Sequence, residues 1–436
     1  MKKGNPIALL PIGIFLVLYL GLGLLFEYAL NIYMGFYNVP IVVAFLVSLL
    51  TACIQNRKLS FDKKLEIMGQ GIGDKNIVTM ILIFLAAGIF VGTVGRESAE
   101  SVANFMLSVM PARYAVAVLF VASCFVSVAM GTSVGTITLL APIAVAVSNT
   151  AGFSLPLCVA SVVGGSMFGD NLSFISDTTI AACSGQGCKM KDKFKENFFI
   201  ALPAAIATLV IIIIFSNNSD IQKIASPEYD LVKTIPYILV LIGGMIGINV
   251  FAVLLIGIAS GAAVMLATGS HTFTTLISSM GSGASGMFET IMVTLLVAAM
   301  CSLIRVHGGF DSILYGVKKI FKGKRGGKLG IGLLVGAMDI ATANNTVAIV
   351  MANPIAKNMS EEYGISNKKV ASLLDTFSCI FQGVIPYGAQ MLVAISAVAE
   401  IGGKISAFDV LPYLFYPAML LISSLVFIFI IPDKNK

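Results

Sequence analysis

The chain has 436 residues, of which 57% are hydrophobic and only 11% are charged, and its net charge is +6. A soluble domain has roughly a quarter of its residues charged, so this composition excludes a soluble protein and indicates one that crosses a membrane several times. Two histidines exclude a histidine-based metal site, and seven mostly scattered cysteines predict a reduced chain without disulfides.

Apolar runs separated by charged or turn-rich breaks predict the membrane segments, and together they predict an all-α polytopic membrane protein. Runs that are too long for one simple span contain polar residues or glycines, which predicts breaks inside them. The predicted segments are 7–26, 39–54, 76–94, 114–148, 155–187, 198–215, 233–248, 250–267, 288–306, 329–357, 370–399 and 411–431.

The distribution of positive charge predicts the orientation in the membrane. We take 114–148 and 329–357 as hairpins that return to the side from which they enter. All Lys and Arg residues then fall on one side except Arg96, Arg113, Lys223, Lys233 and Lys404. The positive-inside rule makes the rich side cytoplasmic, so we expect a multi-pass protein of the cell membrane with both termini in the cytoplasm.

A weak internal repeat divides the chain into units 1–216 and 217–436. A shift of 212 residues aligns Pro142-Ile143-Ala144 with Pro354-Ile355-Ala356. Each unit contains one hairpin (114–148, 329–357) and one interrupted helix (155–187, 370–399), and a short amphipathic stretch precedes each hairpin. The predicted directions of corresponding segments are opposite, so the repeat is inverted. Inverted repeats with interrupted helices are typical of secondary transporters, which bind their ligand near the midplane.

Acidic residues within the first interrupted segment indicate a cation site. Burying such a residue in a membrane costs at least about 2.5–3.5 kcal/mol on insertion scales, so Asp170 and Asp177 mark function. They lie in a glycine-interrupted run among hydroxyl and amide side chains, which suit a hard cation such as sodium. In a low-dielectric site the same carboxylates can carry a proton instead. The candidates in this run are Asp170, Asn171, Ser173, Ser176, Asp177, Thr178 and Thr179.

The hairpin tips and the second interrupted segment complete the candidate site. Small residues at the first tip can also serve helix packing, whereas the paired asparagines at the second favour ligand binding. Asp170 aligns with Gln382 and Asp177 with Ala389, so the acidic residues are not repeated and we expect the two units to contribute unequally to cation binding. Asp339 is either a ligand or a helix cap. The candidates are Thr132, Ser133, Thr136, Asn344, Asn345, Thr346, Asp375, Thr376 and Gln382, with sodium held by Asp170, Asp177, Asn344 and Asn345.

At these residues the chain resembles the NhaC family of sodium/proton antiporters. The resemblance spans most of the chain and rests on Gly169-Asp170-Asn171 through Thr179, and on Leu374 to Cys379 with Gln382-Gly383 and Pro386 to Gln390. The family usually has Ser-Pro-Ile-Ser-Asp where this chain has Ser173-Phe174-Ile175-Ser176-Asp177, so a proline at the break is missing.

A more distant similarity is to the ion-transporter superfamily that includes the sodium–dicarboxylate symporters. In that superfamily, Ser-Asn-Thr motifs at two re-entrant hairpin tips hold sodium and a substrate carboxylate. Asn344-Asn345-Thr346 looks like one such motif, and Thr132-Ser133-Val134 like a degraded version of the other. The resemblance implies re-entrant hairpins and a homodimer.

We therefore expect a secondary transporter, not an enzyme, that exchanges sodium for protons by alternating access without a cofactor. Its expected partners are small inorganic cations and the lipid bilayer, with no nucleic acid. The alternative is a sodium- or proton-coupled carrier of an amino acid or small carboxylate on the same fold. A cation channel is a further rival. An intramembrane hydrolase is poorly supported, because no serine, histidine and aspartate are predicted at a shared depth.

Overall fold

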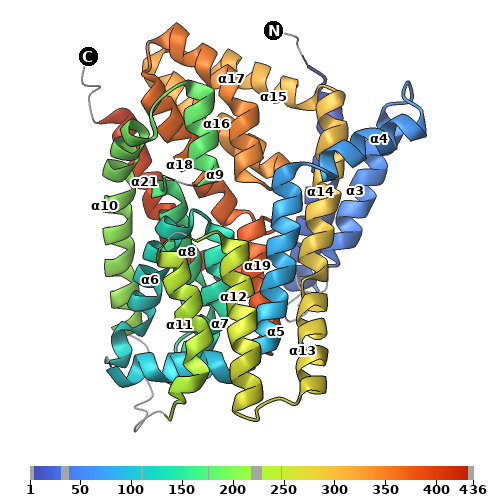
Figure 1. The fold of residues 1–436 in the computed structure, drawn as a ribbon. Helices are drawn as coiled ribbons and strands as arrows, with labels where there is room; N and C mark the ends of the chain where they lie inside the picture. Colours follow the sequence, from blue (N-terminus) through green and yellow to red (C-terminus); the bar gives the residue numbers. More distant parts are fainter. Residues whose placement is uncertain are drawn as a thin grey trace.

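The computed structural model describes residues 4–30, 39–109, 111–174, 176–217, 228–246 and 248–430. Over these ranges the regular structure is helical, and most helices run lengthwise in one bundle (Figure 1). Nine helices in the described part are long and apolar enough to cross a membrane, or ten if a bent pair at 407–429 is one span. The protein is therefore a multi-pass membrane protein. Among positions used above, Ile175, Lys223 and residues 247 and 431 lie outside the described ranges.

The described residues of the first half form ten α-helices, and one of them is kinked. Gly95 (φ 62°, ψ −172°) divides α5, and the part that follows it lies across the lower end of the bundle in Figure 1. This crossing part contains the amphipathic stretch predicted before the first hairpin. The helices are α1 Leu10–Leu16, α2 Leu22–Leu24, α3 Ile41–Gln55, α4 Phe61–Ile72, α5 Lys75–Val109, α6 Ala115–Met130, α7 Ser133–Ala151, α8 Leu155–Leu172, α9 Asp177–Gln186 and α10 Met190–Asn217.

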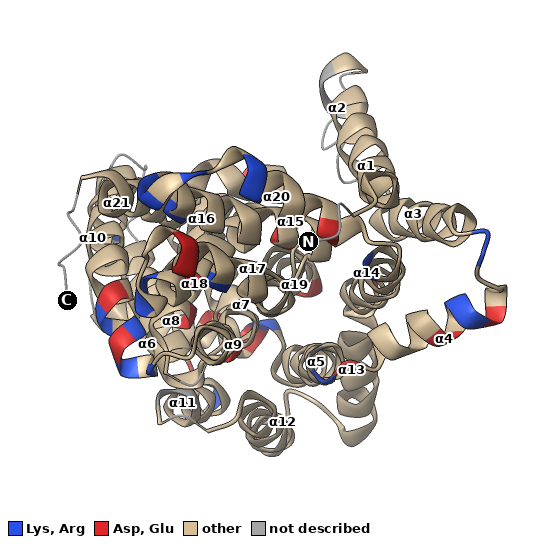
Figure 2. Ribbon diagram, turned by 90° about the horizontal axis from the view of Figure 1, so that it is seen from above, with Lys and Arg blue, Asp and Glu red and all other residues tan. Residues whose placement is uncertain are grey.

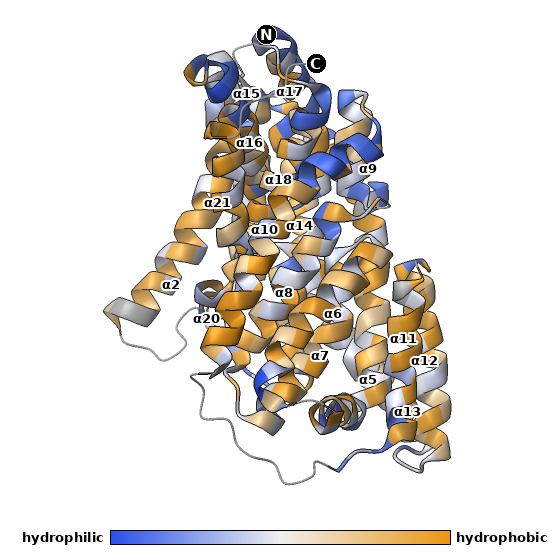
Figure 3. Cartoon of the chain, turned by 90° about the vertical axis from the view of Figure 1, so that its left-hand side faces the viewer, coloured by the Kyte–Doolittle hydropathy of each residue, from blue (hydrophilic) through white to orange (hydrophobic). Residues whose placement is uncertain are grey.

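In the second half, eleven α-helices form within the described ranges. The amphipathic α15 lies across the upper end of the bundle in Figure 1, opposite the crossing part of α5. Figure 3 shows that hydrophilic segments gather at the end that holds α15 and α17. The helices are α11 Leu231–Met245, α12 Val250–Ala267, α13 Phe273–Gly286, α14 Phe288–Val306, α15 Gly309–Ile320, α16 Gly323–Thr342, α17 Asn345–Tyr363, α18 Asn367–Val384, α19 Ala389–Glu400, α20 Ala407–Val410 and α21 Phe415–Phe429.

Helices α7, α8, α18 and α19 form the buried centre of the molecule. Almost every residue of α7 and α8 is buried, although these helices contain many serines, threonines and glycines. Small residues allow close contact: a Cβ at Gly169 would lie 2.3 Å from the Cβ of Ser127 on α6. Seen from above in Figure 2, α1, α3, α4 and α14 form a separate flank beside α5 and α13.

Each of the four long predicted segments contains the expected break. The segment 114–148 becomes α6 and α7, which meet at Gly131 (φ 69°), and 329–357 becomes α16 and α17, which meet at Ala343 (φ 49°). Ala343 is the one residue other than glycine with a positive φ in the described part of the chain. The interrupted helices become the pairs α8–α9 and α18–α19. Polar residues in apolar runs therefore predicted these breaks correctly.

Two regions differ from the sequence interpretation. We assigned no segment to 268–287, whose serines and glycines are typical of a loop, but Phe273–Gly286 forms α13 against α5. The glycines allow this packing, since a Cβ at Gly88 would lie 2.2 Å from the carbonyl oxygen of Gly283. Residues 189–196, which we counted as a cytoplasmic loop, form the start of α10 from Met190 onward.

Candidate functional site

A cavity of about 90 Å³ lies where the two hairpin tips and the two helix breaks meet. Helices α7, α9, α17 and α19 begin beside it, and α6, α8, α16 and α18 end beside it. Helix ends leave backbone N–H and C=O groups without intrahelical partners, so such a junction can bind small ions. The cavity is lined by Thr79, Met80, Ile83, Gly131, Thr132, Ser133, Val134, Asp170, Ser176, Asp177, Thr178, Asn344, Asn345, Thr346, Gln382, Ala389 and Gln390.

Asp170 is the buried carboxylate of this cavity. Its side chain accepts hydrogen bonds from the hydroxyl groups of Ser133 (2.9 Å) and Ser176 (2.5 Å), one at each oxygen. Ser133 in turn accepts from the Gln390 amide at 2.7 Å. Among the described residues no Lys, Arg or His lies within ion-pair distance of Asp170. Neutral hydroxyls stabilise the charge without cancelling it, so the carboxylate keeps its attraction for a cation.

Asp177 reaches the same cavity from a different environment. It is the first residue of α9 and is exposed, whereas Asp170 is 6% exposed. Thr178, the next residue, shares a 2.8 Å hydrogen bond with Ser176, which links the start of α9 to Asp170. The cavity therefore contains one buried and one accessible carboxylate.

The polar residues at the two tips also hold the local backbone. Thr132 accepts from the Gly135 amide (3.4 Å), and Asn344 accepts from the Val347 amide (3.0 Å), so both are helix N-caps. Asn345 Oδ1 accepts from the Thr346 amide at 2.9 Å. These side chains line the cavity and at the same time fix the shape of the break.

A second polar cluster lies behind the cavity and holds Asp375. Its carboxylate forms a buried ion pair with Lys193 of α10, and both side chains are 1% exposed. Lys193 also donates to the Asn171 carbonyl and to Thr179 Oγ1, both at 2.8 Å. Asn197 donates to the Asn171 carbonyl (3.0 Å) and to Asp375 (3.3 Å). The cluster joins α8, α9, α10 and α18 around a fully compensated charge.

Six predicted site residues therefore do not line the cavity. Asn171, Thr179, Asp375 and Thr376 belong to the second cluster, where Thr376 donates to Asn197 at 3.4 Å. Thr136 donates to the Thr132 carbonyl (2.9 Å) inside the first turn of α7, and the amide of Ser173 ends α8 with a bond to the Gly169 carbonyl (2.8 Å).

Sequence reasoning missed Lys193, Asn197 and Gln390. Lys193 stands among other charged residues, which favours a loop. However, Lys193, Asn197, Ile200 and Ala204 recur at helical spacing and all are buried. That periodicity was the available signal for a helix face directed into the protein.

A larger cavity of about 210 Å³ adjoins the central one and shares Met80, Asn344 and Ala389 with it. It extends between α4, α5 and α14 past Asp74 and Arg305, toward the end of the bundle that holds α15. The larger cavity therefore borders the central one on this side of the bundle.

Comparison with known proteins places this architecture in a family. The model of the Na+/H+ antiporter family matches residues 6–217 and 222–430. The chain belongs to the Na+/H+ antiporter family. This membership confirms the predicted resemblance and indicates a transporter. The Na+/H+ antiporter family member NhaC of Bacillus subtilis is 21% identical over 381 residues, which cover 79% of this chain and 82% of that protein.

Another relative and a solved structure are similar to the chain over different lengths. The malate-2H(+)/Na(+)-lactate antiporter of Bacillus subtilis is 26% identical over 46% of this chain, and the aligned part spans less than half (44%) of that relative. The YdaH transporter of Alcanivorax borkumensis, described as having an unusual topology, is a solved structure with 11% identity. It superimposes with a TM-score of 0.48 over 89% of this chain and 97% of that one.

Proposed function

We propose that this member of the Na+/H+ antiporter family exchanges sodium for protons across the cell membrane at the Asp170 cavity. The observation that carries the proposal is the position of Asp170. It is a buried carboxylate without a basic partner in the described part of the chain, and it lies where two hairpin tips and two helix breaks meet. Such a group binds either a sodium ion or a proton, but not both.

Competition for this site accounts for exchange. A buried, uncompensated carboxylate is costly in a low-dielectric interior, and either cation removes that cost. The occupied site can therefore cross to the other side, while the empty, charged site cannot. Ser133 and Ser176 orient the carboxylate, and the hydroxyl, amide and carbonyl oxygens of the tips provide neutral ligands. Asp177, at the accessible edge, attracts the incoming cation.

Asp375 has a different role in this proposal from the one expected from sequence. Because Lys193 compensates its charge, Asp375 does not offer a free negative charge to sodium. We propose that the pair braces the α8–α9 break against α10 and α18.

The helix bounds support the inverted repeat, with units 1–216 and 217–436. A shift of 212 residues carries α7 (133–151) onto α17 (345–363) and α8 (155–172) onto α18 (367–384). The start of α9 at 177 maps onto the start of α19 at 389. We propose that the two helix pairs at the tips are re-entrant hairpins, that both termini are cytoplasmic, and that the protein is a homodimer.

The test uses purified protein in proteoliposomes that contain a pH-sensitive dye and carry an imposed pH gradient. Added sodium should collapse the gradient, added potassium should not, and the Asp170→Asn and Asp177→Asn proteins should lose the response while they stay folded. Sodium that moves no protons through the wild-type protein would exclude the antiport mechanism. Retained exchange in Asp177→Asn would remove only that residue from it.

The alternative cargo is an organic anion. The name of one relative includes malate and lactate. In addition, four helix N-termini, which favour negative charge, border the cavity. The same vesicles distinguish the two functions: a carrier of this kind accumulates a labelled carboxylate only with sodium or a proton gradient, whereas the proposed exchanger needs no organic solute.

A further inference from the structure

A third cavity lies at the opposite end of the bundle. It is lined by α5, α13 and α19 and has a volume of about 460 Å³, roughly five times that of the central cavity. It lies toward the lower end of Figure 1, where α12 and α13 are found, away from α15 and α17. Its polar residues include Ser278, Ser279, Ser282, Ser396 and Glu400.

Glu400 is the carboxylate of this far cavity. Both of its oxygens are buried and have no hydrogen-bond partner in the described part of the chain. Arg96 also lines the cavity, but its guanidinium is paired with Glu100 at 2.5 Å. A carboxylate whose oxygens are shielded from water and lack a donor is costly unless a cation lies beside it or a proton neutralises it.

The far cavity and the central cavity lie along the same two helices. On α5, Met80 and Ile83 line the central cavity, whereas Val91 and Gly95 line the far one. On α19, Gln390 lies at the central cavity and Glu400 at the far one. Ten helical residues separate them, which is about 15 Å along the axis. Both cavities therefore lie along the boundary between α5 and α19.

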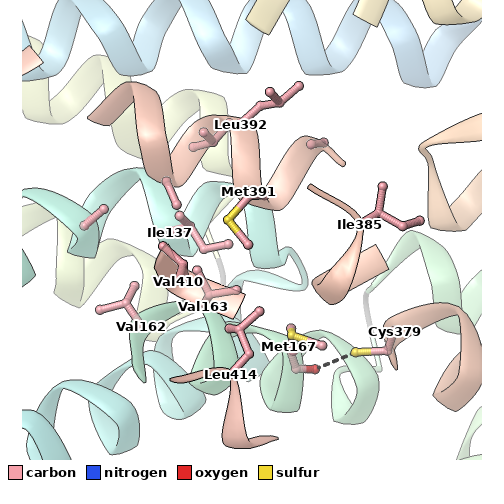
Figure 4. Close-up of a cluster of buried hydrophobic side chains, with 14 of the residues drawn as sticks. Ile137, Val162, Val163, Met167, Cys379, Ile385, Met391, Leu392, Val410 and Leu414 are labelled. Atoms are coloured by element: carbon pink, nitrogen blue, oxygen red, sulfur yellow. Dashed lines mark hydrogen bonds between the residues drawn. The ribbon is translucent and has the colours of Figure 1, made fainter. Parts of the chain in front are cut away.

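Buried apolar residues occupy the stretches of α5 and α19 between the positions that line the two cavities. The α5 residues Phe84, Ala87 and Phe90 are buried, and so are Met391 and Leu392 on α19. Figure 4 shows Met391 near Ile137 of α7. By contrast, the 210 Å³ cavity shares lining residues with the central one. The central cavity thus shares lining residues with the cavity on the α15 side and none with the far cavity.

We propose that the far cavity is a second sodium site, in which the Glu400 carboxylate and the serine hydroxyls of α13 hold a hydrated sodium ion entering or leaving on the side opposite α15. This inference rests on the proposed function. The size of the far cavity supports it, because about 460 Å³ leaves room for a sodium ion together with water molecules. Hydroxyl oxygens and a carboxylate are ligands of the type that hard cations prefer.

The test measures the half-saturating sodium concentration separately on each membrane face, in right-side-out and inverted vesicles. In Glu400→Gln the half-saturating sodium concentration should rise about fivefold on the outer face, since a carboxylate that attracts cations is lost. On the inner face it should stay within about twofold of the wild-type value. Glu400→Asp should restore most of the affinity. The matched control is Glu97→Gln, which removes an exposed carboxylate paired with Lys233 on α11.

A second variant pair tests the same site without removing the charge. A Cβ at Gly286 would lie 2.5 Å from Glu400 Oε1, whereas a Cβ at Gly281 on the same helix meets nothing within 4 Å. Gly286→Ala should therefore displace the carboxylate and raise the outer half-saturating concentration, while Gly281→Ala should not. This pair also provides the answer if Glu400→Gln fails to fold.

Three results would overturn the inference. The first is an outer half-saturating sodium concentration that is unchanged in both Glu400→Gln and Gly286→Ala. The second is an equal change of this concentration on both membrane faces, and the third is an equal change in Glu97→Gln. If wild-type vesicles show no sodium-dependent proton movement at all, the proposed function itself fails. If the wild-type protein exchanges normally and Glu400→Gln keeps the wild-type half-saturating sodium concentration on the outer face, the second site alone is refuted.

Discussion

Asp170 and Asp375 are buried to a similar extent in neighbouring helices, but their surroundings give them opposite properties. Asp170 is held by two hydroxyl groups and faces a cavity, whereas Asp375 is paired with Lys193 and surrounded by amide and hydroxyl donors. The first charge is oriented but not cancelled, and the second is cancelled within the protein. Burial of a carboxylate in a membrane segment therefore does not identify a cation site by itself; the charge of its partners decides the matter.

The largest expected effect is the loss of exchange in Asp170→Asn. The amide still accepts from Ser133 or Ser176, so the break should keep its shape, but the negative charge that binds sodium is gone. Sodium-dependent collapse of a pH gradient should fall at least about 100-fold, to the level of empty liposomes. Asp62→Asn, an exposed carboxylate in the first turn of α4, is the control and should exchange normally.

The next largest effect concerns the stability of the Lys193–Asp375 pair. Lys193→Met leaves a buried carboxylate uncompensated and should lower the free energy of unfolding by about 3–5 kcal/mol. The double variant Lys193→Met with Asp375→Asn removes both charges and should recover most of this loss. Thermal stability of the purified proteins in detergent measures both effects.

Transport by that double variant sharpens the comparison further. If the pair only braces the α8–α9 break, the folded double variant should exchange at a rate within a few-fold of wild type. A double variant that is stable yet inactive would show that the second cluster takes part in transport.

A smaller effect is expected from Ser133→Ala. The change removes one hydrogen bond to a charged group, worth about 1.5–3 kcal/mol in a folded protein, and also leaves the Gln390 amide without its acceptor. The half-saturating sodium concentration should rise about tenfold while the maximal rate changes little. Thr138→Ala on the same helix, whose hydroxyl bonds only to the Val134 carbonyl, should leave both values unchanged.

The smallest effect is expected from Asp339→Asn. Asp339 is completely buried, and both its oxygens lack a partner among the described residues, but it does not line the central cavity. An amide of the same shape costs less to bury than a carboxylate, so stability should stay equal or rise by about 1 kcal/mol. Exchange should remain within about twofold. Loss of exchange in this variant would make Asp339 a second essential carboxylate.

The sequence indicated breaks inside the long apolar runs, because polar residues there are costly, and ten of the candidate residues lie around the cavity. It did not predict the partner of Asp375. Lys193 lies five residues before the predicted segment 198–215, among lysines that do face solvent. Only the packing of α10 against α8 and α18 reveals its position. Composition also hid α13, because its serines and glycines are typical of loops, yet they allow the close approach to α5.

The most direct test of the central claim is equilibrium binding of radioactive sodium to the purified protein in detergent. Wild type and the Lys193→Met, Asp375→Asn double variant should show saturable binding that falls as the proton concentration rises, and Asp170→Asn should show none. Sodium binding by Asp170→Asn with wild-type affinity, or its loss in a stable double variant, would contradict the assignment of the transported cation to Asp170.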